Sequence, residues 1–339
     1  MEGLVAPGFE AVAAAFATDP RGGSALTVLR HGEPMLDVRE GWRDAARTGP
    51  WDANTLVNVY SAGKPILAAA VLLLVQRGLI DLHAPTATYW PSFRTPASVR
   101  DLLAHLAGLP SFPIERPVEA WADWDLLCAD LAAATPEWEP GTVAAEHALK
   151  YGHLLGELVR RVDGREPAVF VAEEIGADLG FALSPSDLSR CAELEYSAPD
   201  WPAQMLGAPG SVHARAISNP PGARDVRVVN SPLWRQAAVP AVNVHTSSAA
   251  LARFYADVLG GRLPALAVPQ HTGTDLFIEQ EVTWGFGVQI EADGTWGQGG
   301  LGGNAGWADP ARGFAIAYVT RRLGDFAAVD RIETALNAL

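Results

Sequence analysis

The chain has 339 residues, of which 49% are hydrophobic and 19% are charged, a balance typical of globular proteins and unlike disordered or coiled-coil chains. Its 25 basic and 39 acidic side chains give a formal net charge of −14. This charge argues against nucleic acid as a partner, because binding to phosphates needs a basic patch. Only Lys64 and Lys150 are lysines, so the position of each one is informative.

Cysteine content and apolar runs indicate where the protein works. The two cysteines, Cys128 and Cys191, are too few for a disulfide framework in a chain of this size, which fits a reducing compartment. Residues 1–16 lack a basic segment and include acidic residues, unlike a signal peptide. The longest apolar run, 66–75, is about half of the roughly twenty residues that a membrane span needs. We therefore expect a cytoplasmic protein that does not contact membranes.

Apolar patterning in the first two thirds of the chain predicts a hairpin followed by many helices. A short helix is expected over 8–18, and the runs 24–30 and 35–42 flank a turn, as in a β-hairpin. Residues 62–77 form an apolar run that predicts a buried helix. Further helical patterns alternate with proline-rich loops, and we expect these helices at 98–106, 118–134, 147–162 and 167–178.

The last third returns to strands. A helix is expected over 246–260 and an amphipathic helix over 325–338, and between them lie strand-like apolar runs at 283–291, 294–298, 304–308 and 314–320. Strands at both ends around a helical middle favour an α+β fold with one sheet assembled from both ends of the chain. The expected domains are a discontinuous sheet domain, 1–80 and 226–339, and a mainly helical insertion, 81–225.

The sharpest local motif is Ser61-Ala62-Gly63-Lys64, at the start of the predicted helix 62–77. A serine three residues before a lysine places both side chains on one face of the first helical turn. The helix N-terminus supplies N–H donors for an oxyanion and favours a neutral lysine. A neutral lysine can take the serine proton and generate an acylating nucleophile. Taken alone, the spacing fits a helix-capping serine beside a solvated lysine equally well.

The surrounding sequence gives this motif a wider context. The stretches VNVYSAGKPILAAAVLLLVQRGLIDL and TPASVRDLLAHLAGLPSF, followed by 139–165 and 296–324, strongly resemble the serine β-lactamase-like family. That family includes class C β-lactamases, D-amino-acid peptidases, family VIII carboxylesterases and some acyltransferases. The resemblance implies the β-lactamase and penicillin-binding-protein-like fold, with an antiparallel sheet flanked by helices and an inserted helical domain. It also implies that Ser61 is the nucleophile and Lys64 its general base.

The family's second motif, a tyrosine shortly after a Pro-Gly-Thr turn, is not kept. Counting from 140–142, its position holds Glu146, and Tyr151 follows where the family often has an aromatic that packs. A carboxylate beside Lys64 favours the charged lysine and opposes its use as a neutral base. Lys150, four residues after Glu146, is expected to form a helical pair with it. Three roles for Glu146 therefore stay open. It replaces the tyrosine, it acts as a base in its own right, or it is a surface carboxylate paired with Lys150.

The third motif of the family, Lys-Thr-Gly or His-x-Gly on the strand that lines the site, falls at Gln298-Gly299-Gly300. A neutral amide thus replaces its cationic first residue, while the glycines let the strand backbone approach a substrate. The resemblance makes the N–H of Leu301 the second oxyanion donor, beside that of Ser61. The other expected substrate-lining residues are Tyr60, Lys150 and Tyr151.

These motifs predict acyl transfer through a Ser61 ester, to water or to a small alcohol or amine. The substrates would be small esters, lactones or amides, and no metal or organic cofactor is implied; His147, His153 and Glu157 lack the spacing of metal ligands on one helix face. Three rivals stay open, namely an acyltransferase, a non-catalytic binding protein, and an enzyme using Glu146 as base for elimination, isomerisation or cyclisation. The expected partner is a small molecule, and the oligomeric state is left open.

Overall fold

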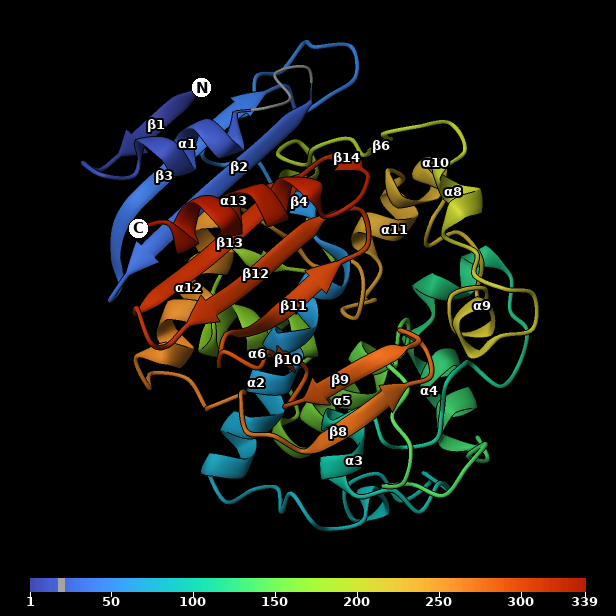
Figure 1. Ribbon diagram of the computed structural model, residues 1–339. Coiled ribbons are helices and arrows are strands. Elements are labelled where there is room, and N and C mark those ends of the chain that lie inside the picture. The colour runs from blue at the N-terminus through green and yellow to red at the C-terminus, as the bar shows by residue number, and fades with distance from the viewer. Residues whose placement is uncertain (18–21) are drawn as a thin grey trace.

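The structure is a computed structural model that describes residues 1–17 and 22–339, and it is built around a nine-stranded antiparallel sheet (Figure 1). In spatial order the strands are β1 (Glu2–Val5), β3 (Glu33–Gly41), β2 (Gly23–Arg30), β13 (Phe314–Thr320), β12 (Asn304–Asp309), β11 (Trp296–Gly300), β10 (Gln289–Ile290), β9 (Gln280–Trp284) and β8 (His271–Asp275). Strand β2 pairs with β13, with Leu26 opposite Tyr318. The two ends of the chain therefore share one sheet, as the sequence predicts.

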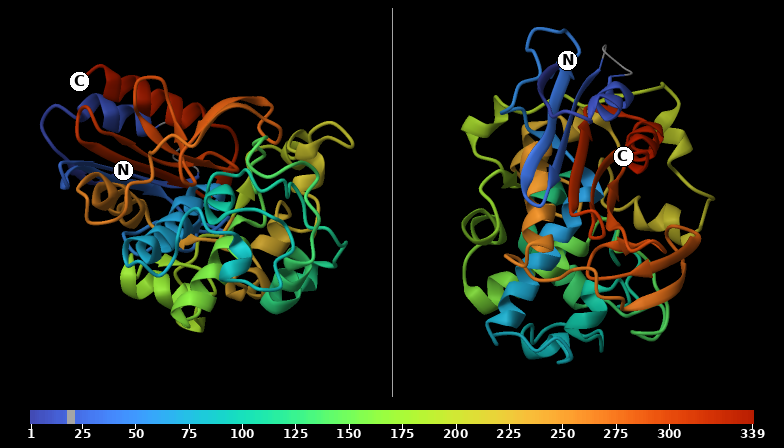
Figure 2. Two further views of the ribbon diagram at one scale, coloured as in Figure 1. Left: turned by 90° about the horizontal axis from the view of Figure 1, so that it is seen from below. Right: turned by 60° about the vertical axis from the view of Figure 1, so that its left-hand side comes forward.

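Helices cover both faces of this sheet, as Figure 2 shows from two further directions. On the outer face lie α1 (Glu10–Phe16) and α13 (Ala327–Asn337), whose apolar side chains pack on β2, β3 and β13. On the inner face lie α12 (Ser248–Leu259) and, beyond it, α2 (Lys64–Gln76). Burial on both faces explains why β2 and β13 are buried almost throughout and lack a polar-apolar alternation.

The remaining elements lie mostly around α2, which packs against α5 and α6. The helices are α3 (Val99–Leu103), α4 (Trp124–Ala132), α5 (Tyr151–Asp163), α6 (Pro167–Glu174), α7 (Pro185–Leu188), α8 (Trp201–Gln204), α9 (Val212–Ala216), α10 (Val226–Val229) and α11 (Pro232–Gln236), with 3₁₀ turns η1 (Tyr60–Gly63), η2 (Thr86–Thr88) and η3 (Val118–Ala122). The described residues also form two small sheets. One contains β4 (Val57–Asn58), β7 (His245–Thr246) and β5 (Leu179–Gly180), in that order, and the other pairs β14 (Arg322–Leu323) with β6 (Glu195–Tyr196).

The structure changes several predicted boundaries. The predicted helix 118–134 is divided at Asp123, whose side chain caps α4 by accepting from the N–H of Leu126. The predicted helix 147–162 begins only at Tyr151. The predicted helix 8–18 is α1, and residue 18 lies outside the described residues. The division of the chain into domains at 81 and 225 stays a prediction.

Both edge strands of the nine-stranded sheet were missed, for physical reasons. Strand β8 has the sequence HTGTD, which is polar, and its place at the sheet edge leaves alternate side chains exposed. Strand β1 is a mostly exposed edge strand at the other side of the sheet. Because apolar patterning detects burial, it gives little signal for such edge strands.

Candidate active site

The predicted nucleophile motif lies where η1 runs directly into α2. Ser61 is in the 3₁₀ turn, and Lys64 is the first residue of the α-helix, which Pro65 helps to start. The preceding residue, Tyr60, has a φ of +51°, a left-handed backbone that costs a non-glycine residue about 1–2 kcal/mol. Such strained positions cluster at functional sites, where the surrounding structure holds them in place.

Lys64 is fully buried, and its ammonium contacts three oxygen atoms. Nζ lies 2.5 Å from Ser61 Oγ and 3.2 Å from the carbonyl oxygen of Ala241. The third contact is an ion pair of 2.9 Å with Oε1 of Glu146. Three N–H donors and three oxygens thus match in number, and Lys64 connects Ser61 to Glu146.

Gly63 explains how the Ala241 carbonyl comes so close to Lys64. A Cβ added at Gly63 would lie 2.6 Å from the side chain of Val244, so only glycine lets η1 approach this segment. Sequence reasoning had no signal for the Ala241 contact, because it is made by a backbone oxygen 177 residues away.

Burial and Glu146 act on the pKa of Lys64 in opposite directions. Loss of solvent is the larger effect and lowers the Lys64 pKa, while the charge of Glu146 raises it. The net result is a pKa below the ordinary lysine value. The carboxylate therefore acts as the sequence predicts, but burial outweighs it and the lysine keeps access to its neutral form.

His105 holds Glu146 in position through the backbone N–H groups of the two residues that flank it in the chain. Its carbonyl accepts a hydrogen bond from the N–H of Ala145, and its Nδ1 accepts one from the N–H of His147, both at 3.1 Å. Burial holds the pKa of His105 well below its usual range, so the ring is neutral and Nδ1 is free to accept. We therefore identify His105 as a positioning residue for Glu146, which is itself buried.

The predicted pairing of Lys150 with Glu146 is wrong. Because α5 begins only at Tyr151, residues 146 and 150 do not share a helix, and no ion pair joins them within the described chain. Lys150 is instead buried, with Nζ donating to the carbonyl of Pro110 at 2.5 Å. Burial, with help from the charge of Lys64, lowers the pKa of Lys150 to about 7. The alternative that Glu146 is a surface carboxylate paired with Lys150 is also wrong, because Glu146 is buried and its ion-pair partner is Lys64.

Asp275, at the end of β8, is a further buried charge that sequence reasoning missed. Its Oδ2 accepts from Trp284 Nε1 at 2.8 Å, and its Oδ1 accepts from the N–H groups of Phe277 and Ile278. Burial, together with the nearby charge of Glu146, raises the pKa of Asp275. Asp275 is thus stabilised by hydrogen-bond donors, whereas Glu146 is stabilised by its ion pair with Lys64.

Tyr151 does not line a substrate site. Its side chain is completely buried, its hydroxyl donates to the carbonyl of Leu103 at 2.9 Å, and its ring packs on His105 at 4.5 Å. The expectation for Tyr151 is therefore corrected to that of a core residue. Lys150 is buried in the same way, bound to Pro110, and belongs to the polar core beside the site.

The third motif lies on β11, whose glycine end passes directly over η1. A Cβ added at Gly300 would lie 2.1 Å from the carbonyl oxygen of Val59 and 3.2 Å from the nitrogen of Ala62. The glycine is therefore required for the strand to approach Ser61 so closely. Leu301 follows at once, partly exposed, and no hydrogen bond from its N–H is found within the described residues.

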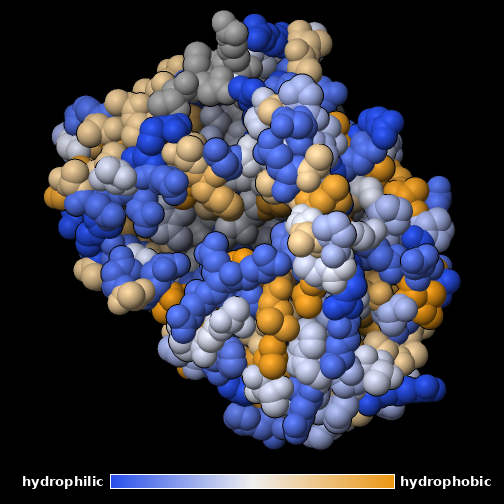
Figure 3. Space-filling view, turned by 45° about the vertical axis from the view of Figure 1, so that its right-hand side comes forward, coloured by the Kyte–Doolittle hydropathy of each residue, from blue (hydrophilic) through white to orange (hydrophobic). Residues whose placement is uncertain are grey.

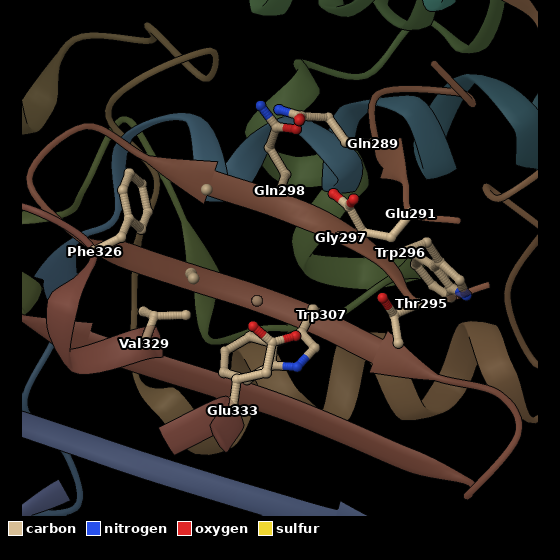
Figure 4. A pocket seen from close by; sticks show the side chains of 13 residues that line it. Gln289, Glu291, Thr295, Trp296, Gly297, Gln298, Trp307, Phe326, Val329 and Glu333 are labelled. Carbon is tan, nitrogen blue, oxygen red and sulfur yellow. The ribbon is translucent and has the colours of Figure 1, made fainter. Parts of the chain in front are cut away.

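The edge of β11 next to this turn is open. Strand β10 pairs only with Trp296 and Gly297, so residues 298–300 have β12 on one side and no strand on the other. Figure 4 shows Gln298 and Gln289 at one edge of a cavity over β11, with Val329 and Glu333 of α13 at the other. Gln298 is buried, and its Oε1 has no hydrogen-bond partner in the described part of the chain.

Residues 9–339 match the family model described as Beta-lactamase. The chain belongs to the beta-lactamase family. The "Esterase/beta-lactamase LipL" of Mycobacterium tuberculosis is 31% identical to this family member over 364 aligned residues, covering 95% of the chain and 83% of LipL. A family VIII carboxylesterase structure superposes with a TM-score of 0.88 at 28% identity, covering 100% of this chain and 99% of that one. A penicillin-binding-protein homologue from Caulobacter crescentus gives 0.87 at 30% identity, covering 99% of each chain.

These comparisons confirm the fold expected from the sequence, an antiparallel sheet flanked by helices with the β-lactamase and penicillin-binding-protein-like arrangement. Over residues 1–17 and 22–339, no helix has the length and apolar character needed to cross a bilayer. The same residues contain no group of three or more histidine, cysteine or carboxylate side chains suited to a metal ion. Cytoplasmic location, the absence of a cofactor and the exclusion of nucleic acid stay predictions.

Proposed function

We propose that this chain is a serine hydrolase of the esterase type, acting on small esters, lactones or amides through an acyl-enzyme on Ser61. The observation that carries the proposal is the 2.5 Å contact between Lys64 Nζ and Ser61 Oγ at a buried lysine. It is supported by the names of the relatives, which include an esterase/beta-lactamase and a family VIII carboxylesterase.

In the first half of the reaction, neutral Lys64 accepts the proton of Ser61 Oγ as that oxygen attacks the substrate carbonyl. The N–H groups of Ser61 and Leu301 are the proposed donors to the resulting oxyanion. Glu146 stabilises the ammonium that forms on Lys64, since the two are already 2.9 Å apart. Lys64 then gives the proton to the leaving alkoxide or amine, and the C–O or C–N bond breaks.

In the second half, water attacks the Ser61 ester, Lys64 accepts a proton from it, and Ser61 Oγ leaves and is reprotonated. A small alcohol or amine in the place of water gives acyl transfer by the same steps. In this scheme Glu146 acts on Ser61 only through Lys64, in the way that a carboxylate stabilises the base of a Ser-His-Asp triad. The scheme thus explains how the site works without the tyrosine of the second motif.

The pH dependence of ester hydrolysis tests this assignment. Activity is expected to fall as the pH drops through the pKa of Lys64, because the protonated lysine cannot accept the Ser61 proton. Since Glu146 raises that pKa, Glu146→Gln is expected to move the acid limb of kcat/KM to lower pH. The measurement is the hydrolysis of p-nitrophenyl butyrate across pH 4–10. This range extends to both sides of about neutral pH, where general bases operate.

Two results would contradict the assignment. If Glu146 were itself the base for Ser61, Glu146→Gln would abolish p-nitrophenyl butyrate hydrolysis at every pH rather than shift the profile. If the folded wild-type protein hydrolysed no activated ester at any pH, the esterase function itself would be wrong. Glu137→Gln is a suitable control, because that carboxylate is paired with Arg215 away from Lys64.

A further inference from the structure

The hairpin of β8 and β9, at the edge of the large sheet, contacts the segment that carries Glu146. In the turn between the two strands, the N–H of Leu276 donates to the carbonyl of Ala144 at 2.9 Å. The exposed side chains of the hairpin are polar, like most of the face of the molecule shown in Figure 3. Its inner side instead joins a buried apolar cluster, formed by Ala104, Leu106, Ala144, Val282 and Trp284.

Asp275 organises this hairpin from inside. Its Oδ1 accepts from the N–H groups of Phe277 and Ile278, at 2.8 and 2.9 Å, and so closes the turn in which Leu276 lies. Its Oδ2 accepts from the indole N–H of Trp284, on the partner strand, at 2.8 Å. Asp275 and Trp284 are both fully buried. Because an unpaired buried acceptor is costly, this carboxylate fixes both the turn and the indole ring.

Trp284 in turn packs on His105. The two rings meet edge to face, with their centres 4.3 Å apart. His105 has a φ of +62°, a left-handed backbone that a non-glycine residue keeps only where its surroundings hold it. The carbonyl and the Nδ1 of His105 accept the N–H groups on either side of Glu146. An unbroken series of direct contacts therefore runs from Asp275 to the segment of Glu146.

We propose that Asp275 is a positioning residue for the reaction, which holds Glu146 against Lys64 through Trp284, His105 and the carbonyl of Ala144. The inference rests on the proposed function and adds a residue that acts on its base from a distance. Asp275 makes no hydrogen bond or ion pair with Ser61 or Lys64 in the described chain. It acts through the 2.9 Å ion pair, which stabilises Lys64 when that lysine becomes charged.

Other ionisable groups also face Glu146, and most of them stay neutral. Burial holds the pKa values of His105 and His147 well below the usual range and raises that of Tyr151 well above it. Burial also lowers the pKa of Lys150 to about 7, so Lys150 titrates within the assay range in wild-type protein and variants alike. A difference between proteins therefore reports on the ion pair between Lys64 and Glu146, or on the charge of Asp275 itself.

Trp284→Phe and Asp275→Asn are the test variants, measured on p-nitrophenyl butyrate. Trp284→Phe keeps a ring against the cluster but removes the hydrogen bond to Asp275. Each variant is expected to lower kcat by about tenfold with little change in KM, since displacing a catalytic group by an ångström costs up to about a hundredfold. The acid limb of kcat/KM should move to lower pH, because a displaced Glu146 raises the pKa of Lys64 by less.

The double variant Asp275→Asn/Glu146→Gln separates position from charge. A direct effect of the Asp275 charge on Lys64 would persist after Glu146 is removed, whereas a positioning effect would disappear. We expect Asp275→Asn to change kcat by less than about twofold in the Glu146→Gln background, which is strong coupling between the two sites. Equal effects of Asp275→Asn with and without Glu146 would overturn the inference.

Trp124→Phe is the matched control, because its indole N–H also donates to a buried carboxylate, that of Glu157, at 2.9 Å. It should lose stability in urea and keep the wild-type kcat and pH profile. If Trp284→Phe behaved in the same way, Asp275 would be only structural and the esterase function would stand; this variant decides the test alone if Asp275→Asn does not fold. If folded wild-type protein hydrolysed no activated ester, both proposals would be wrong.

Discussion

Ser61→Ala is expected to lower kcat for ester hydrolysis by about four to six powers of ten, because the variant has no oxygen to form the acyl-enzyme. The free energy of unfolding should change little. Ser61 is partly exposed, and its hydroxyl makes its contact with Lys64 rather than with the apolar core. The measurement is steady-state hydrolysis of p-nitrophenyl butyrate together with urea denaturation of the same preparation.

Ser186→Ala provides the matched control for this variant. Ser186 is an exposed serine in α7, so the same chemical change there should leave both activity and stability unaltered. A loss of less than tenfold in well-folded Ser61→Ala would mean that the nucleophile is a different residue or that the hydrolysis does not pass through an acyl-enzyme.

Lys64→Met has the second largest expected effect, a fall in kcat of about a hundredfold to ten-thousandfold, which is the usual worth of a general base. This variant is also expected to lose stability. Methionine keeps the apolar stem of lysine but leaves Glu146 buried without its partner, and such a loss costs about 3–5 kcal/mol. Activity at pH 8 and the free energy of unfolding in urea are the two quantities to measure.

The double variant Lys64→Met/Glu146→Gln separates these two effects. Removing the stranded carboxylate should recover most of the lost stability, since no buried charge is left unpaired. Activity should stay as low as in the single variant, because the base is still missing. Recovery of activity along with stability would contradict the role of Lys64 as the base and indicate that the lysine is only structural.

Much of the candidate site was predictable because it depends on short-range geometry. The spacing of Ser61 and Lys64 fixes their side chains on one turn, and the contact is made as expected. The replacement of a tyrosine by Glu146 could also be found by counting from the turn before it. The ion pair with Lys64 then follows, because a buried lysine in a site of this fold needs a counter-charge.

The parts that were mispredicted depend on contacts that sequence spacing does not encode. Lys150 looked like a helical partner of Glu146, yet the helix starts one residue after it and its ammonium turns to the Pro110 carbonyl. Asp275 had no motif around it, and its place near Glu146 results from the pairing of β8 at the sheet edge. Both lysines are nonetheless buried close enough for the charge of Lys64 to lower the pKa of Lys150.

Covalent labelling with a fluorophosphonate tests the central claim most directly, because the reagent reacts with an activated serine and not with an ordinary one. Wild-type protein should gain one adduct, and peptide mass spectrometry should place it on Ser61. Labelling should disappear in Ser61→Ala and slow strongly in Lys64→Met. An adduct on another serine, or no adduct on folded wild-type protein, would contradict an acyl-enzyme mechanism at this site.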